Sequence, residues 1–319
     1  MSEQLDVSVV LIIFNRPKET ARAFAAIREA RPRQLFVIAD GPRNEADRSL
    51  CEAARAVVEK GVDWPCVVHR NYAEKNLGCG YRPATGITWV FEQVEQAIIL
   101  EDDCIAHPSF FPFAQELLEK YAHDERVMHI VGNCFQENNS NFNIRESYYA
   151  SFIPMINGWA TWRRAWKFYD FDIKEWPALR ESRVLIDSFH NHGAYDLFEM
   201  KWDSYYKKHV KDSWDGQWAL ACMSRGGISL TASVNLISNI GFNERATHTK
   251  SKTEQAEMRI HAMHFPLTHP KELMINREAD NYVYRYHFGV DKQFRQRLMR
   301  PFKNHFPNIY KNIKRLLEK

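Results

Sequence analysis

The stretch Ile98-Ile99-Leu100-Glu101-Asp102-Asp103-Cys104 joins a short apolar run to three consecutive carboxylates. An apolar run of this length is typical of a buried strand. Adjacent acids repel one another unless a cation lies among them. Hard divalent ions such as Mg²⁺ or Mn²⁺ bind carboxylate oxygens together with substrate phosphates. The stretch therefore indicates either a metal-binding strand end or a solvated acidic loop, and these residues alone leave both hypotheses open.

Strands and helices alternate on either side of this stretch. Buried strands are expected at 7–14, 35–39, 66–68, 97–100 and 128–131. Helices are expected around 20–27, 53–58, 84–94 and 110–121. This alternation predicts an α/β fold with an open, mainly parallel sheet that helices cover on both faces. In the second half we expect helices at 158–168, 196–209 and 215–224 and strands at 228–230 and 234–240, which complete the same domain and form the acceptor side of a cleft.

The length of 319 residues, 45% of them hydrophobic, fits one large domain with an appendage. We expect a catalytic domain at 1–270, with a nucleotide-sugar half at 1–135 and an acceptor half at 136–270, and a basic helical extension at 271–319. The first residues lack the pattern of a signal peptide, and no apolar stretch is long enough to span a bilayer, which predicts a cytoplasmic protein. The six cysteines are widely spaced, which favours reduced thiols.

Polar residues follow three of the expected strands where each strand ends. Asn15-Arg16 follows the first, Asp40-Gly41 the second and Glu101-Asp102-Asp103 the fourth. Ligands of open parallel sheets bind outside the carboxyl ends of the strands. Any one of these groups could be an ordinary turn, but together they predict a nucleotide, phosphate and metal site at one sheet edge.

Glycine-rich phosphate motifs are missing from the first strand end, where Phe14-Asn15-Arg16-Pro17 stands. A dinucleotide-binding dehydrogenase needs Gly-x-Gly-x-x-Gly there, and the sequence also lacks the Gly-x-x-x-x-Gly-Lys-Ser/Thr loop of nucleoside triphosphatases. Phosphate charge would then be met by a metal ion and by basic side chains such as Arg16 and Arg82.

These strand-end motifs, with Asn76-x-Gly78 before a helix, resemble the nucleotide-diphospho-sugar transferases of the GT-A fold, a Rossmann-like α/β fold. The likeness is nearest to bacterial family-2-like enzymes related to N-acetylglucosaminyltransferase I, and it covers roughly 7–249. It extends to Gly158-Trp159, Trp162-Arg163 and Trp214-Asp215-Gly216-Gln217-Trp218.

The resemblance implies a metal-dependent, inverting glycosyltransferase that uses Mn²⁺ or Mg²⁺. It would move a sugar, with a UDP-sugar favoured, to a hydroxyl of a glycan or lipid-linked acceptor in bacterial surface polysaccharide synthesis. Asp103 would bind the metal, with His248 as a second candidate ligand, and Asp102 would contact the ribose or the metal shell. The catalytic base would be Asp215 or, less favoured, Asp212.

The same resemblance assigns the nucleotide-sugar contacts. Asp40 would accept a hydrogen bond from the base, and Arg16 would hold the nucleotide. The other expected contacts are Asn15, Asn76, Gly78 and Arg82.

Two other functions remain open. Sugar nucleotidyltransferases have a similar sheet, but they usually carry a glycine-rich, arginine-containing loop after the first strand. The other is a non-catalytic nucleotide-sugar-binding protein, against which the retained carboxylates argue. We expect Asp170-x-Asp172 to be a solvated turn and His261-x-x-His264 to be structural rather than a metal site.

The last 28 residues, 292–319, carry nine Lys and Arg against Glu318 alone. Apolar residues recur there at steps of three or four, interrupted by Pro301 and Pro307. This pattern predicts a basic amphipathic helix that either packs on the domain or lies on an anionic membrane surface, on the inner face of the membrane. Nucleic-acid binding is not expected, because the body is net acidic and has no groove-reading motif.

Overall fold

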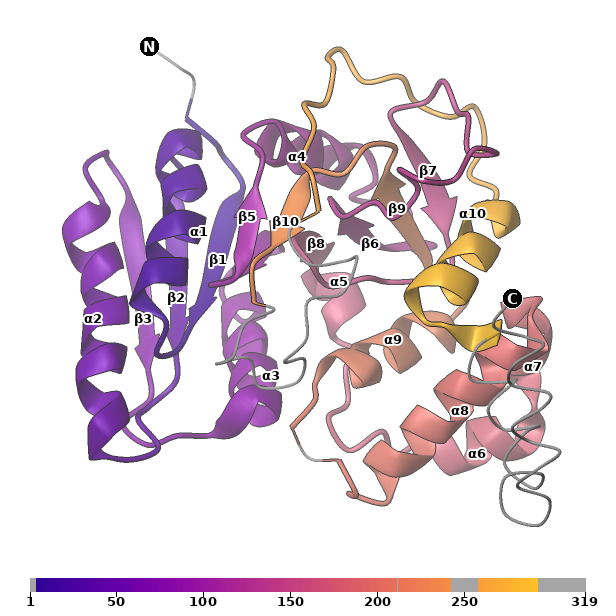
Figure 1. Ribbon diagram of the computed structural model, residues 1–319, viewed down its shortest axis with the longest axis horizontal. Coiled ribbons are helices and arrows are strands. Elements are labelled where there is room, and N and C mark those ends of the chain that lie inside the picture. The colour runs from indigo at the N-terminus through magenta and orange to yellow at the C-terminus, as the bar shows by residue number, and fades with distance from the viewer. Residues whose placement is uncertain (1–3, 211, 242–257, 292–319) are drawn as a thin grey trace, which may run out of the picture.

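The computed structural model describes residues 4–210, 212–241 and 258–291 (Figure 1). Its main sheet has eight strands in the order β3-β2-β1-β4-β8-β6-β9-β7, and β10 pairs with β5 in a separate two-stranded sheet. The strands are β1 (Ser8–Ile13), β2 (Gln34–Ala39), β3 (Val67–Tyr72), β4 (Gln96–Glu101), β5 (Cys104–Ala106), β6 (Val127–Val131), β7 (Tyr148–Ser151), β8 (Trp159–Trp162), β9 (Ile228–Ala232) and β10 (Ile237–Asn239).

The helices cover both faces of this sheet and extend beyond it. They are α1 (Pro17–Ala30), α2 (Glu45–Gly61), α3 (Gly78–Phe91), α4 (Phe110–Lys120), α5 (Arg163–Trp166), α6 (Trp176–Ser182), α7 (Val184–Phe189), α8 (His192–Tyr206), α9 (Asp215–Met223), α10 (Arg277–Tyr282) and the π-helical turn η1 (Val283–His287).

Six strands of the sheet run in one direction, and β8 and β7 run against them. β8 lies between β4 and β6 and is antiparallel to both. The predicted α/β fold with a mixed, mainly parallel sheet is therefore confirmed.

The buried strands alternate between two cores, as strand geometry requires. On β1, Val9 and Leu11 pack in the cluster that contains residues of α1, α2 and α4. Val10 and Ile12 pack in the opposite cluster, with residues of α3, α5 and α9. Figure 1 shows α1 and α2 side by side over the first three strands. Both faces of the central strands are thus removed from water, which explains their continuous apolar runs.

A third apolar cluster lies outside the sheet and joins α6, α7, α8 and η1. Its fully buried aromatic residues include Trp176, Trp202 and Tyr284. Four tryptophans that helical spacing assigns to the core, Trp159, Trp162, Trp166 and Trp202, are at most 4% exposed.

The predicted helix at 158–168 is wrong over its first half. Trp159–Trp162 forms β8, and only Arg163–Trp166 is helical. Tryptophans three and four residues apart imitate a helical face, but pairing with β4 and β6 decides the local structure. The predicted strand at 234–240 is shorter, because only Ile237–Asn239 pairs, with β5. The strands β5 and β7 were not predicted.

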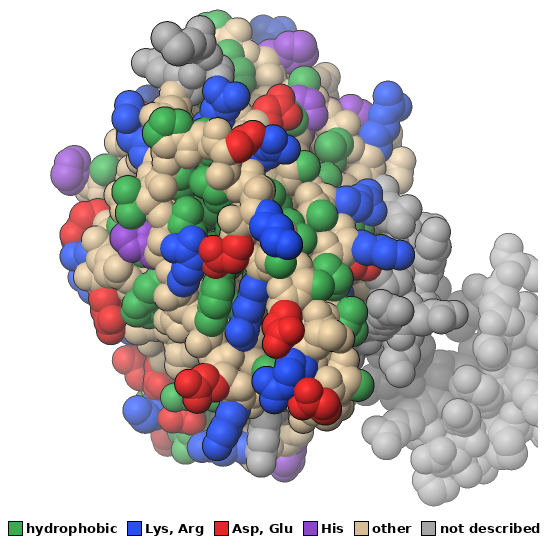
Figure 2. All heavy atoms as spheres, turned by 90° about the vertical axis from the view of Figure 1, so that its left-hand side faces the viewer, with side chains coloured by type: hydrophobic (Ala, Val, Ile, Leu, Met, Phe, Trp, Pro, Cys, Tyr) green, Lys and Arg blue, Asp and Glu red, His purple; other side chains and the backbone are tan. Residues whose placement is uncertain are grey.

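The surface on the α2 side mixes basic and acidic side chains, as Figure 2 shows. Ion pairs such as Arg48 with Glu45 and Arg70 with Glu59 join several of them. No helix in the described ranges is long and apolar enough to cross a membrane. None of the six cysteines, all of which lie in the described residues, forms a disulfide. The predicted tail helix at 292–319 lies outside the described residues.

Candidate active site

The carboxyl ends of three neighbouring parallel strands lie level at one edge of the sheet. Ile13 pairs with Ala39, and Ile12 pairs with Glu101. The residues that follow β1, β2 and β4 therefore emerge together, as the sequence predicts. Asn15-Arg16, Asp40-Gly41 and Asp102-Asp103 are the polar groups at this edge.

Arg16 joins two of the three acids. One terminal nitrogen lies 2.5 Å from Asp102 Oδ1, and the other lies 3.1 Å from Asp103 Oδ2. The other oxygen of Asp102 accepts a hydrogen bond from the backbone N–H of Phe14 at 3.3 Å. Asp102 is therefore bound from two sides, whereas the side chain of Asp103 is 15% exposed.

Negative charge exceeds positive charge in this cluster. Burial raises the pKa of Glu101 and of Asp102, and their acidic neighbours raise both further. Burial alone would lower the pKa of Arg16, but the three carboxylates raise it above its ordinary value. One guanidinium thus faces three carboxylates in a poorly solvated place. A divalent cation would relieve this repulsion.

Gly241 closes one side of Asp103. The backbone N–H of Ile240 donates to the Asp103 carbonyl at 2.9 Å, where β10 leaves β5. A Cβ on Gly241 would lie 2.2 Å from Asp103 Oδ2, so a larger residue there would have to displace this carboxylate. His248 lies outside the described residues, and its role as a metal ligand stays a prediction.

Asp40 organises the loop that precedes α3. Its Oδ1 accepts from the backbone N–H groups of Gly41 and Leu77, both at 2.8 Å. Its Oδ2 accepts from the Gly78 N–H at 3.0 Å and from the Asn76 side chain at 2.9 Å. A carboxylate has about four acceptor positions, so these contacts fill them. The predicted contact of Asp40 with a nucleotide base remains untested, and its observed role is to hold this loop.

Two glycines make this loop possible. Gly41 has no room for a Cβ, which would fall 2.4 Å from the backbone of Lys75. Gly78 has φ +85°, a backbone conformation that favours glycine. Asn76 and Gly78, both predicted to contact the donor, are thereby placed at the start of α3.

Arg82 and Asn15 also have internal partners. The buried Arg82 guanidinium donates to the carbonyl of Ala39 at 3.2 Å and to the Asn71 side chain at 2.9 Å. Asn15 donates to Asp47 at 2.7 Å. The structure thus uses Arg82 to join β2 to β3, and its contact with a donor phosphate stays a prediction.

Asp215 is the first residue of α9, where a carboxylate interacts favourably with the helix dipole. Ser213 Oγ donates to its Oδ1 at 2.5 Å, and the rest of the side chain is exposed. The charge of Asp215 contributes to the raised pKa of Glu101, so Asp215 lies within electrostatic range of that carboxylate. The structure therefore brings the predicted base near the end of β4, where Asp102 and Asp103 follow.

Helix α8 fixes the position of α9. Trp202 Nε1 donates to the Gly216 carbonyl at 2.9 Å, and a Cβ on Gly216 would lie 2.1 Å from the ring of Tyr205. Trp202 is fully buried, so this anchor cannot shift without disturbing the third apolar cluster. The start of α9 is thus held rigidly beside the sheet edge.

Two residues near the candidate bases, Asp215 and Asp212, belong to no motif that the sequence analysis identifies. Lys201 lies 5.2 Å from the ring centre of Phe288, and burial lowers its pKa while Asp215 raises it in part. Cys79 Sγ lies 3.5 Å from the carbonyl of Asp212, the less favoured base candidate. Lys201 lies on α8 and Cys79 on α3, so the packing of these helices, not a sequence motif, brings the two residues close to the candidate bases.

The motifs Asp170-x-Asp172 and His261-x-x-His264, which the sequence does not predict to bind metal, lie in a turn and in an irregular segment. Asp170 Oδ1 accepts from the backbone N–H of Asp172 at 3.1 Å, which makes a turn. His261 lies in an irregular segment 3.3 Å from Glu137. Neither belongs to the sheet edge described above.

The donor atoms at this edge fit a metal ion that a substrate helps to bind. Among the described residues, no group of three His, Cys, Asp or Glu side chains could enclose an ion. Asp103 presents hard carboxylate oxygens in a place with uncompensated negative charge, which suits Mn²⁺ or Mg²⁺. Ions of this kind are commonly held by one or two carboxylates and the phosphates of a nucleotide.

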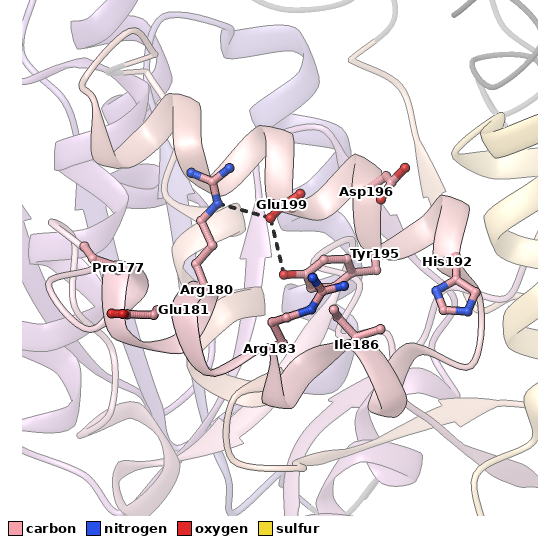
Figure 3. Close-up of a pocket in the computed structure, with 9 residues that line it drawn as sticks. All are labelled: Pro177, Arg180, Glu181, Arg183, Ile186, His192, Tyr195, Asp196 and Glu199. Carbon is pink, nitrogen blue, oxygen red and sulfur yellow. Dashed lines mark hydrogen bonds and ion pairs between the residues drawn. The ribbon is translucent and has the colours of Figure 1, made fainter. Parts of the chain in front are cut away.

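A hollow lies between α6, α7 and α8, away from this edge (Figure 3). Its volume is about 540 Å³. Arg180 donates to Glu199 at 3.1 Å, and Tyr195 donates to the same oxygen at 3.5 Å. Arg180 also pairs with Asp203 at 3.0 Å. In contrast to the acidic edge, this hollow pairs acidic with basic side chains.

No family model matches the chain, and no curated protein matches it. Solved structures match it in part. A mannosyltransferase, PcManGT from Pyrobaculum calidifontis in complex with GDP-Man and Mn²⁺, is 13% identical with a TM-score of 0.38, over 52% of this chain and 47% of that chain. S. aureus TarS 1-349 is 11% identical with a TM-score of 0.37, over 52% and 49%.

A UDP-glucose pyrophosphorylase complexed with UDP-glucose is 12% identical with a TM-score of 0.32, over 51% of this chain and 78% of that chain. The alignments span about half the length of the first two proteins. None of the three is an N-acetylglucosaminyltransferase I, and that finer resemblance stays a prediction.

Proposed function

We propose that this chain is a glycosyltransferase that moves a sugar from a nucleotide diphosphate to a hydroxyl group, with inversion at the anomeric carbon. The observation that carries the proposal is the bridge from Arg16 to Asp102 and Asp103, with Asp215 within electrostatic range of the adjacent Glu101. A basic group and carboxylates for the diphosphate, and a separate exposed carboxylate for the acceptor, are the parts that this reaction needs.

The donor would bind at the level ends of β1, β2 and β4. Asp103, the more exposed partner of Arg16, would bind the Mn²⁺ or Mg²⁺ ion, and His248 is a further candidate. Asp102 would face the ribose. The loop that Asp40 holds would shape the nucleoside pocket, with Asn76 and Gly78 at its end. Asn15 would support Arg16 by fixing the start of α2 through Asp47.

A divalent ion bound with the donor would neutralise the charge that builds on the departing diphosphate. The acceptor hydroxyl oxygen forms a bond to the anomeric carbon as the bond from that carbon to the diphosphate oxygen breaks. The electron pair of the broken bond stays on the diphosphate, where Arg16 offers positive charge.

Asp215 accepts the proton of the attacking hydroxyl. Ser213 holds one oxygen of this carboxylate, which leaves the other free for the acceptor. A general base of this kind contributes roughly 10²–10⁴-fold to the rate. Because one carboxylate suffices and no second nucleophile is assigned, a single displacement with inversion follows.

As the acceptor we propose a glycan or lipid-linked precursor in bacterial surface polysaccharide synthesis. As the donor we favour a UDP-sugar. The enzyme would act in the cytoplasm, and the basic tail at 292–319 would hold it at the inner face of the membrane. Flotation with anionic vesicles at low salt tests the tail, because a protein that stays at the bottom of the gradient does not bind them.

The reaction is tested by incubating the protein with a panel of nucleotide sugars and Mn²⁺. We expect release of nucleoside diphosphate, faster with the right acceptor and lost in Asp103→Ala. Release of pyrophosphate from a nucleoside triphosphate and a sugar phosphate would instead identify a nucleotidyltransferase. Tight nucleotide-sugar binding with no turnover, unaffected by Asp215→Asn, would identify a binding protein.

A further inference from the structure

Arg16 lies beside Asp103, the predicted metal ligand. Its two terminal nitrogens contact two different carboxylates, at 2.5 Å on Asp102 and 3.1 Å on Asp103. Among the described residues, Arg16 makes all the ion pairs of these two acids. Positive charge is therefore already present where the proposed metal ion must go.

The two halves of this bridge differ in how firmly they are held. Asp102 is 3% exposed, makes the shorter contact and also accepts from the Phe14 N–H. Asp103 is 15% exposed and makes the longer contact. The contact between Arg16 and Asp103 therefore takes less free energy to break than the contact between Arg16 and Asp102.

The backbone of Arg16 is fixed, so only its side chain can move. Its carbonyl accepts from the N–H of Thr20 at 2.8 Å and from Thr20 Oγ1 at 2.7 Å, and Pro17 begins α1 directly after it. Gly241 lies against Asp103 Oδ2, because a Cβ at position 241 would fall 2.2 Å from that oxygen. A cation that binds this oxygen either shares it with the Arg16 nitrogen or displaces that nitrogen.

We propose that Arg16 is an internal counter-cation that keeps Asp103 occupied until nucleotide and metal arrive together. The nucleoside diphosphate supplies new acceptors for the Arg16 nitrogen that leaves Asp103 and new ligands for the metal ion. Metal and nucleotide then bind cooperatively. The nucleotide lowers the free energy needed to separate Arg16 from Asp103, and the metal ion neutralises the carboxylate that Arg16 has left. The proposal rests on the proposed function, since it takes Asp103 as the metal ligand.

A bridge that only stabilises the fold predicts a different behaviour. Loss of a structural ion pair would lower the stability and leave metal affinity unchanged or weaker. Loss of a competing cation raises the affinity of Asp103 for metal ions, because the carboxylate is no longer neutralised by a neighbour. Metal affinity in the absence of nucleotide therefore separates the two roles.

The experiment measures Mn²⁺ binding to the full chain by electron paramagnetic resonance, with and without uridine or guanosine diphosphate. The variants are Arg16→Gln, which removes the charge, and Arg16→Lys, which keeps the charge but replaces the two terminal nitrogens of the guanidinium with one. Arg43→Gln is the matched control. Arg43 lies near the same edge and forms its ion pair with Asp47, not with the three consecutive acids.

Without nucleotide we expect Arg16→Gln to bind Mn²⁺ about tenfold more tightly than the wild type, a change of about 1.4 kcal/mol. Arg16→Lys should fall between them, and Arg43→Gln should match the wild type. Adding the nucleoside diphosphate should tighten Mn²⁺ binding strongly in the wild type and less in Arg16→Gln. If Arg16→Gln does not fold, the same comparison is made with Arg16→Lys.

Two outcomes overturn the proposal and can be told apart. If the Arg16 variants bind Mn²⁺ no more tightly than the wild type while nucleotide still promotes binding, the counter-cation role is wrong and the metal site stands. If no protein binds Mn²⁺ with or without nucleotide, the metal site of the proposed function fails, and the counter-cation role fails with it.

Discussion

Gly241 lies so close to Asp103 that a Cβ on this glycine would fall 2.2 Å from the carboxylate oxygen Oδ2. The same oxygen accepts from Arg16 at 3.1 Å. A residue that follows β10, far away in the sequence, therefore lies directly against the carboxylate that Arg16 contacts.

Gly241→Ala is expected to displace Asp103 and to lower both the metal response and the turnover, while the protein remains folded. Gly226→Ala is the control: Gly226 has φ +62° and nothing within 4 Å of an added Cβ. The alanine should cost about 1–2 kcal/mol of stability and leave turnover unchanged. Turnover is compared across Mn²⁺ concentrations, and equal effects of the two substitutions would refute the proposed steric role of position 241.

Asp215→Asn is expected to lower turnover roughly 10²–10⁴-fold and to leave nucleotide binding near the wild-type value. The amide keeps the size of the side chain and its contact with Ser213 but cannot accept the proton. Steady-state rates and calorimetric nucleotide affinities measure the two effects separately. If Asp212→Asn shows the loss and Asp215→Asn does not, the base has been assigned to the wrong carboxylate.

Asp40→Ala is expected to destabilise the fold as well as to weaken nucleotide binding. The substitution leaves the N–H groups of Gly41, Leu77 and Gly78 without their acceptor, and each unsatisfied group costs about 1–3 kcal/mol when buried. Urea unfolding measures the change, with Asp172→Ala, an exposed turn residue, as the control. Wild-type stability in Asp40→Ala would show that the loop does not depend on this carboxylate.

Parts of this site can be predicted from the sequence because they follow from continuous apolar runs. The strands β1, β2 and β4 are buried on both faces, and their ends are marked by the first polar residues. The parallel order of the strands then places Arg16, Asp40 and Asp103 at the same edge.

Other features depend on long-range contacts that the local sequence does not encode. The segment 159–162 becomes a strand because it pairs with β4 and β6, although its tryptophans suggest a helix. Arg82 is turned inward by acceptors on Ala39 and Asn71, which no spacing reveals. The loop geometry likewise gives Asp40 four internal donors. A polar residue at a strand end suggests a contact with the nucleotide base, and the sequence alone does not reveal these four donors.

His129 makes stability depend on pH. It is fully buried, its Nδ1 accepts from Trp218 Nε1 at 3.1 Å, and its Nε2 donates to the Met155 carbonyl at 2.6 Å. Burial lowers its pKa from 6.5 to about 3, although the bond to Met155 opposes this shift. Between these two values the unfolded chain binds the extra proton and the folded chain does not. Its contribution to stability is therefore complete above pH 6.5 and declines as the pH falls toward 3.

His129→Gln should flatten this dependence. The wild-type slope from this group is at most about 1.4 kcal/mol per pH unit, and other groups contribute equally to both proteins. Denaturant unfolding at several values between pH 3.5 and 7 gives the difference between the two curves. Parallel curves would mean that His129 is not held neutral in the fold.

The location of the donor site is tested most directly by a crystal structure with uridine diphosphate and Mn²⁺, in which anomalous scattering locates the metal. We expect the Mn²⁺ ion roughly 2.0–2.3 Å from an Asp103 oxygen, with the diphosphate between it and Arg16. Nucleotide bound in the hollow between α6, α7 and α8, or Mn²⁺ remote from Asp103, would contradict the proposed active site.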